Sequence, residues 1–332
     1  MPLLVVACSC SASALWAQDS DSQAADANQS WTASTESQSD GTSQTRSVES
    51  HTQSGNRTVD NRAIEHRDAN GRFVPYQDIE TTTVKVDATT VRTITRTFGR
   101  DADGAKSLVQ VTEEEKRSLP GGESRMVRST SNPDVNGQLQ LVQRETAETK
   151  KPSKNVEETK TTVLRPGANG GLDASMKLEE RRQTGANGKV ESQKTTLFPD
   201  AAGHWQVGEV RQSTTTQEGS SRSTEERVSR PDAEGKLSEV SCTVTQETGE
   251  AGEKHSSVEK YSADAPGTAP DGRLHLVERA TTAQRGNSAG TQATHTVQKA
   301  DANGSFGVVS VDTTQSDKSA VQVQIAPSET PK

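Results

Sequence analysis

The sequence predicts an all-β protein, an antiparallel meander of long hairpins in repeats of about 33 residues, forming a largely single-layer elongated sheet with almost no helix. The first observation behind this prediction is a turn of the form Asp-x-Asn-Gly that recurs along the chain. Its glycine returns with spacings of 33, 33, 33, 33, 32, 37 and 32 residues, at Gly71, Gly104, Gly137, Gly170, Gly203, Gly235, Gly272 and Gly304. The second observation is the alternating, β-branched character of the segments between the turns.

The residues of the turn predict its geometry. In Asp68-Ala69-Asn70-Gly71 the aspartate can accept a backbone hydrogen bond from two residues on, and the glycine supplies a positive φ. This pattern is typical of a type I turn closed by a G1 bulge, the usual three-residue hairpin loop.

Such a loop also predicts the register of each hairpin, because the turn aspartate then pairs with the residue after the glycine. Five hairpins should carry an apolar cross-strand pair three or four residues from the turn, whereas the Asp134 and Gly167 hairpins lack one. The expected pairs are Ile64 with Tyr76, Phe98 with Leu108, Leu197 with Val207, Val228 with Val240, and Val297 with Val309.

A second, looser set of turns falls about halfway between these, for example at Pro120-Gly121-Gly122. Each repeat is therefore two strands of roughly 12 to 14 residues, or about 40 Å at 3.3 Å per residue. The segments Val111–Leu119 and Leu178–Arg182 contain helix-forming residues, but the closely spaced turns favour strand there. The longest repeat contains Ala263–Pro270, where we expect a protruding loop.

The composition, 28% hydrophobic and 3% aromatic, is too poor in apolar residues for an ordinary core. Disorder is one alternative. The periodic turns favour a single-layer sheet instead, in which the stems of long polar side chains cover the backbone and the apolar pairs form a stripe along one margin. Such a sheet is similar, in architecture only, to the single-layer segment of a spirochaete outer surface protein.

About 16 long strands also suit an outer-membrane barrel, which needs alternating apolar residues and aromatic girdles at both interfaces. Two Tyr, four Phe and three Trp cannot supply two girdles, and no run approaches the roughly 20 apolar residues of a membrane helix. The sequence therefore predicts no membrane span.

The chain divides into four parts. Residues 1–17 are interpreted as a signal peptide that lacks the usual basic start, 18–55 as a disordered spacer rich in Ser, Gln and Thr, 56–312 as the β-hairpin repeat domain, and 313–332 as a terminal strand and polar tail. The end of the spacer, Ser43–Thr52, can alternatively be a first strand. The segment ending in Cys8 resembles the lipobox of bacterial lipoproteins, which implies an acylated anchor.

No constellation for chemistry emerges. Removal of the signal peptide leaves Cys242 alone in a strand-like run, and the six histidines never show a metal-ligand spacing. The adjacent acids Glu179-Glu180 and Glu225-Glu226 should lie on opposite faces of a strand as solvated charge. The turn motif resembles part of a calcium loop, but turn formation alone explains it. We therefore predict no catalytic, cofactor-binding or metal residues, no cofactor and no enzyme activity.

The net charge of −8, with both signs interspersed, argues against nucleic acid as a partner. The sequence predicts an exported, non-enzymatic β-repeat protein, secreted or at the cell surface or periplasm, which acts as a structural spacer or cell-surface interaction module. The alternative is an adhesin or binding protein for an envelope polymer or a partner protein. The partner, protein or polysaccharide, is unknown, and we expect free sheet edges to allow self-association.

Overall fold

The fold is given by a computed structural model, which describes residues 29–39, 43–101, 103–250, 252–266, 272–286 and 290–317. The predicted signal peptide with Cys8, residues 267–270 of the expected loop and the tail beyond residue 317 lie outside these ranges.

The described chain is a succession of antiparallel strands, as predicted, and its one helical element is the 3-10 turn η1 (Pro120–Gly122). The two segments with helix-forming residues lie in strands. The 18 strands are β1 (Gln29–Ser39), β2 (Ser43–Ser54), β3 (Arg57–Arg67), β4 (Phe73–Lys85), β5 (Thr90–Arg100), β6 (Lys106–Ser118), β7 (Ser124–Pro133), β8 (Leu139–Ser153), β9 (Val156–Pro166), β10 (Leu172–Thr184), β11 (Val190–Pro199), β12 (Trp205–Glu218), β13 (Ser221–Pro231), β14 (Leu237–Glu250), β15 (Glu253–Ser262), β16 (His275–Gly286), β17 (Gly290–Ala300) and β18 (Phe306–Asp317).

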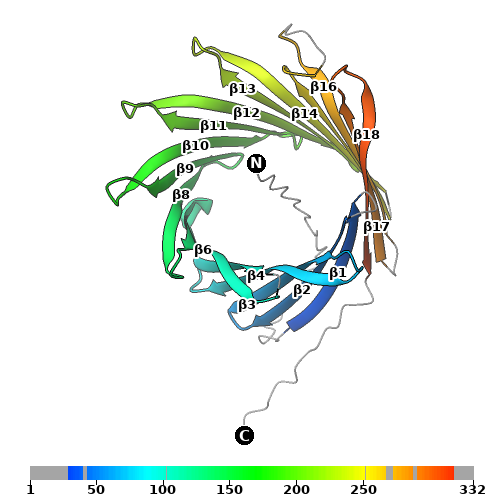
Figure 1. The fold of residues 1–332 in the computed structure, drawn as a ribbon. Coiled ribbons are helices and arrows are strands. Elements are labelled where there is room, and N and C mark those ends of the chain that lie inside the picture. Colours follow the sequence, from blue (N-terminus) through cyan, green and yellow to red (C-terminus); the bar gives the residue numbers. More distant parts are fainter. Residues whose placement is uncertain are drawn as a thin grey trace.

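Each strand pairs with the next along the chain, and β1 pairs with β18, so the meander closes into a ring (Figure 1). The closing seam contains five residue pairs, from Thr35 opposite Ser316 to Ser39 opposite Asp312, against eleven between β1 and β2. The first and last strands, which an open sheet would leave as free edges, therefore bond to each other over these five positions.

The wall begins earlier than the sequence suggested. Residues 29–39, which fell in the expected spacer, form β1, and the alternative of a strand at Ser43–Thr52 agrees with β2. β2 pairs with β3 over ten positions, from Thr45 opposite His66 to Ser54 opposite Arg57. The polar composition of these strands resembles a linker, but their backbone groups are satisfied by neighbouring strands and need no apolar side chains.

The Asp-x-Asn-Gly turns have the predicted geometry. The Gly71 amide donates to the Asp68 carbonyl at 3.0 Å, and Gly71 has a φ of +80°. The Asp68 carboxylate accepts from the amides of Asn70 (2.9 Å) and Arg72 (2.8 Å). Because turns alternate between the two ends of a meander, all these turns lie at one end of the barrel, which we call the Asp-x-x-Gly end.

In the seven Asp-x-x-Gly hairpins other than β15–β16, the predicted register is correct for the first three pairs and shifts by one residue at the fourth. Phe98 lies opposite Leu108 and Leu197 opposite Val207, as expected. Ile64, in contrast, lies opposite Gln77. A β-bulge at the fourth residue of the second strand in each of these seven hairpins explains the shift, because two residues there oppose one. The bulge likewise places Val228 opposite Ser241 rather than Val240, and Val297 opposite Ser310 rather than Val309.

Apolar side chains gather near the Asp-x-x-Gly end, and few side chains of the described wall are fully buried. Val163, four residues before the turn at Gly167, is the most covered of them at 2% exposure. Every Phe, Tyr and Trp side chain that the structure describes lies near this end: Phe73, Tyr76, Phe98, Phe198, Trp205, Tyr261 and Phe306. Cations lie over three of these rings, Arg46 over Phe73 (4.4 Å), Lys106 over Phe98 (3.8 Å) and Lys177 over Trp205 (4.2 Å). A single-layer wall thus replaces a shared core with local clusters capped by basic side chains.

Candidate functional site

In a closed sheet, successive side chains point alternately into and out of the ring. In β8, Gln143, Glu145 and Ala147 are half-buried or buried, while Arg144 and Glu148 are exposed. Side chains on the concave side converge and cover one another, so we assign the Glu145 set to the inner face. The strand pairings carry this assignment around the ring.

The inner face of the described wall includes two hollows with charged linings. One, of about 430 Å³, lies over β5–β8 and is lined by threonines together with Glu114, Arg128 and Glu145. Arg128 donates two hydrogen bonds to Glu114, at 2.6 and 2.9 Å, and one to Glu145 at 3.3 Å. The guanidinium is thus held by carboxylates from both neighbouring strands, an arrangement that fixes its orientation.

The larger hollow, of about 520 Å³, lies over β10–β13. Arg211 donates to Glu209 at 2.6 Å and to Glu226 at 3.2 Å, and Glu209 also accepts from Arg230 at 2.9 and 3.0 Å. Glu180 and Lys194 line the same hollow. A third hollow, of about 400 Å³ and lined mainly by Ser and Thr, lies on the opposite face over β14–β17.

The outer face is also polar. Cross-strand ion pairs follow it around the ring, including Arg92–Glu115 (2.9 Å), Arg125–Glu148 (3.2 Å) and Arg181–Glu158 (3.6 Å). Neither face therefore has an apolar residue at every second position. This is the property that a membrane barrel was expected to need and that the sequence was found to lack.

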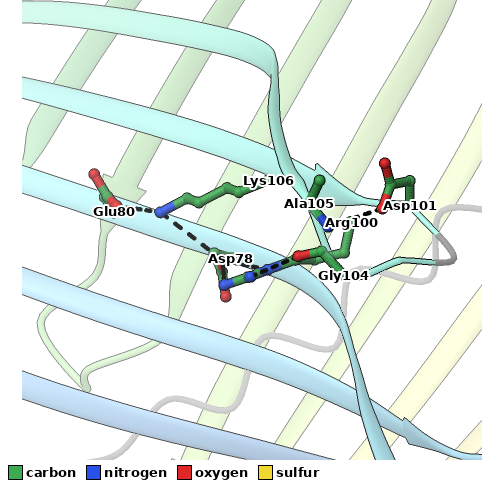
Figure 2. A network of polar contacts seen from close by, with 7 residues as sticks. All are labelled: Asp78, Glu80, Arg100, Asp101, Gly104, Ala105 and Lys106. Carbon is green, nitrogen blue, oxygen red and sulfur yellow. Dashed lines mark hydrogen bonds and ion pairs between the residues drawn. The ribbon is translucent and has the colours of Figure 1, made fainter.

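Near the Asp-x-x-Gly end this polar network joins the turns to the wall (Figure 2). Arg100 donates to the carboxylate of Asp78 at 2.6 and 3.0 Å and to the Gly104 carbonyl at 3.0 Å. Lys106 lies 2.5 Å from Glu80 and 3.8 Å from Asp78.

The turn carboxylates are held ionised by backbone donors. Hydrogen bonds from the Gln138 amide and the His204 amide hold the pKa values of Asp134 and Asp200, respectively, below the usual range. In the second set of turns, hydrogen bonds led by the Thr89 amide lower the pKa of Asp87 to about 2. These groups stabilise turns, which agrees with the sequence-based preference for turn formation over calcium binding.

The residues considered from sequence are scattered. Cys242 is a buried, unbridged thiol in β14, and its sulfur lies 3.9 Å from a Glu225 carboxylate oxygen. Among the residues that the structure describes, no group of three or more potential metal ligands occurs. No helix in the described ranges is long and apolar enough to cross a bilayer.

The sequence analysis missed the inner-face cluster of β10–β13. It considered Glu180 and Glu226 only as parts of the acidic pairs Glu179-Glu180 and Glu225-Glu226, whose two side chains lie on opposite faces of a strand. The strand pairings place Glu180 and Glu226 on the inner face and Glu179 and Glu225 on the outer face. The cluster could have been found from the sequence by taking every second residue of each strand, which gives one face, and aligning that face across consecutive hairpins in the predicted register.

Fold and wall together define a closed antiparallel β-barrel with a polar inner surface. No protein-family model and no curated protein matches the sequence. Among solved structures, the chain is similar to outer-membrane porins of Pseudomonas aeruginosa, and each match covers 90% of this chain. OccK5 (OpdH) is 9% identical, with 98% of its chain covered and a TM-score of 0.54. OccK3 (OpdO) is 9% identical, with 96% of its chain covered, and OpdL is 8% identical, with 98% covered; both have a TM-score of 0.53.

These similarities correct one expectation. The sequence predicted no membrane span, but the chain has the barrel fold with which porins cross the outer membrane by strands. The sequence analysis rejected a barrel because aromatic and alternating apolar residues are scarce, but closure of the ring depends on backbone pairing between strands, which those residues do not decide. The coarser expectation, an exported β protein of the cell envelope, agrees with these neighbours.

Proposed function

We propose that this chain is a porin-like barrel of the bacterial outer membrane that lets small polar solutes pass through its lumen. The observation that carries the proposal is the closed ring of strands with a polar inner face. No described helix or strand lies inside the ring (Figure 1).

The inner face suits hydrated solutes. Its hydroxyl rows, such as Thr81 with Thr95 (3.3 Å) and Thr215 with Thr224 (3.0 Å), offer donors and acceptors that can replace water around a solute. Its charged groups occur mostly as pairs of opposite sign, for example Arg128 with Glu114. Such a surface favours passage of small neutral or zwitterionic molecules over strong selection for one sign of charge.

The outer face makes membrane insertion the most demanding part of the proposal. A lysine or arginine facing lipid at the bilayer midplane costs about 2–4 kcal/mol. Here the cations are paired with carboxylates on neighbouring strands, as in Arg92–Glu115, which lowers the charge presented to the surroundings. Insertion must therefore be measured together with transport.

The test is reconstitution of the chain from residue 18 into liposomes, with swelling in arabinose and single-channel conductance as readouts. Deleting residues 101–133, one 33-residue repeat, removes β6 and β7 and leaves 16 strands. Since barrel diameter grows roughly linearly with strand number, the cross-section and the conductance should fall by about a fifth. Absence of swelling and conductance, or a deletion variant with unchanged conductance, would overturn the proposal.

A structural spacer or cell-surface interaction module is the second candidate, with an adhesin as its variant. The ion-paired outer face favours it, because paired charges are stable in water and offer a polar surface to an envelope polymer. The same deletion separates the candidates. A spacer keeps working with one repeat fewer, and a localised binding site is lost only when its own repeat is removed.

A further inference from the structure

We propose that the hollow over β10–β13 is a binding site for small solutes that carry both an ammonium and a carboxylate group. Glu180 would receive the ammonium and Lys194 the carboxylate. The proposal rests on the proposed function only for the route by which such a solute reaches the inner wall.

The register places the two charged groups side by side. Glu180 on β10 lies directly opposite Lys194 on β11, and Lys194 lies opposite Arg211 on β12. Opposite residues have Cβ atoms roughly 4.5–5.5 Å apart. All three line the same hollow of about 520 Å³, so an acid and a base face one small space.

The remaining charges of the hollow are already neutralised. Arg211 is held by Glu209 and Glu226, and Glu209 is shared with Arg230. These two arginines and two glutamates sum to no net charge. The hollow therefore presents one uncommitted carboxylate and one uncommitted ammonium group.

Within the described part of the chain, neither group forms an ion pair with another residue. Glu180 accepts one hydrogen bond, from the Ser192 hydroxyl at 3.3 Å, and Lys194 has no carboxylate within ion-pair distance. The Lys194 ammonium keeps three donors for a ligand and the Glu180 carboxylate keeps most of its acceptor sites. A zwitterion neutralises both charges at once, whereas a simple anion or cation neutralises one of them and a sugar neither.

The floor of the hollow supplies apolar contact. Met176 and Leu178 precede Glu180 on the same face of β10 and line the hollow. A short methylene chain between the two ligand charges can lie against them and lose its contact with water.

Comparison with the hollow over β5–β8 shows why the zwitterion site is assigned to the hollow over β10–β13. In the hollow over β5–β8 the only cation, Arg128, is occupied by Glu114 and Glu145. That hollow offers hydroxyl groups and one carboxylate charge more than Arg128 balances, and its lining includes no second cation that could receive the carboxylate of a zwitterion.

The experiment is isothermal titration calorimetry of the detergent-solubilised full chain with 4-aminobutanoate, butanoate, butylamine and arabinose as probes. The unsubstituted chain should bind 4-aminobutanoate at least tenfold more tightly than the other three. Lys194→Met and Glu180→Gln should each weaken that binding at least tenfold. The matched control is Lys160→Met, which removes a lysine of the outer face that is 74% exposed and 3.7 Å from Glu179, and it should leave binding unchanged.

The exchange variant Glu180→Lys with Lys194→Glu decides between recognition and a structural effect. It retains one charge of each sign in the hollow, so it should restore binding of 4-aminobutanoate to within about threefold of the original. Single variants that bind as the unsubstituted chain does, or an exchange variant that stays weak, would overturn the inference. Calorimetry in detergent does not require passage, so binding without liposome swelling would refute the proposed function alone, and swelling without binding would refute only this site.

Discussion

Gly170 and Gly171 provide a matched test of whether backbone geometry at the turns holds the barrel wall together. Gly170 ends the turn that starts at Gly167 and has a φ of +76°, whereas Gly171 beside it has no positive φ. A Cβ added at either residue meets nothing within 4 Å. Replacement by alanine therefore changes backbone preference at both positions and steric contact at neither.

The expected magnitudes follow from two opposing effects. An L-residue in the left-handed region costs roughly 1–2 kcal/mol, which applies to Gly170→Ala only. Alanine also restricts the unfolded chain, which stabilises both variants by roughly 0.4–1 kcal/mol. The unfolded-state effect cancels when the variants are compared, so Gly170→Ala should be about 1–2 kcal/mol less stable than Gly171→Ala.

The assay is hydrogen exchange of the β9 and β10 amides, together with urea unfolding of the whole chain. Opening of this hairpin should be about 5- to 30-fold more frequent in Gly170→Ala than in Gly171→Ala. Gly170→Asn should recover part of the loss, because asparagine tolerates a positive φ. Equal protection in both alanine variants would refute the role assigned to the left-handed turn residue.

Three further predictions concern single side chains. Asp87→Asn should remove a pH dependence of stability. Because the pKa of Asp87 is lowered in the folded chain, its ionised form stabilises the fold fully above about pH 4, and this contribution is lost as the pH falls from about 4 to 2. In that window the unfolding free energy of the variant should depend less on pH than that of the unsubstituted chain. Val163→Ala should cost about 2 kcal/mol in urea unfolding, because Val163 is 2% exposed, while Val127→Ala, at 44% exposure, should cost less than about 0.5 kcal/mol; equal losses would contradict the assignment of covered positions in the wall. Asp78→Asn should lower the unfolding free energy by about 1–2 kcal/mol, since this carboxylate is 13% exposed and accepts two arginine hydrogen bonds, and Glu115→Gln, at 49% exposure, should change it by less than about 1 kcal/mol; the reverse order would contradict this reading of the pairs.

Local structure was predictable because it depends on residues close in sequence. The turn Asp68–Gly71 was predicted to the level of its hydrogen bonds, since an aspartate, an asparagine and a glycine at these spacings suffice to build it. The bulge at Tyr76 was not predicted. A bulge increases the local twist of a pair of strands, and whether it forms depends on the two strands together. No single residue type in this segment indicates its position.

The candidate site could be predicted only in part. The alternation of strand side chains already separates Glu179 from Glu180, as the sequence analysis stated. That Glu180, Lys194 and Arg211 share one concave surface depends on the direction of curvature. Direction of curvature is a property of the whole sheet and is absent from the period-two pattern of any one hairpin.

By itself the sequence determined the all-β class, the recurring turns, the meander order and the first three pairs of every Asp-x-x-Gly hairpin except β15–β16, because each depends on contacts between residues close in sequence. Closure was decided only by the tertiary structure. It requires Ser39 to meet Asp312, and that pair forms only if the small twists of every intervening strand add up to one full turn. A small change in twist per strand leaves each hairpin intact and separates the ends, so the barrel, its lumen and its inner and outer faces could not be deduced from local pattern.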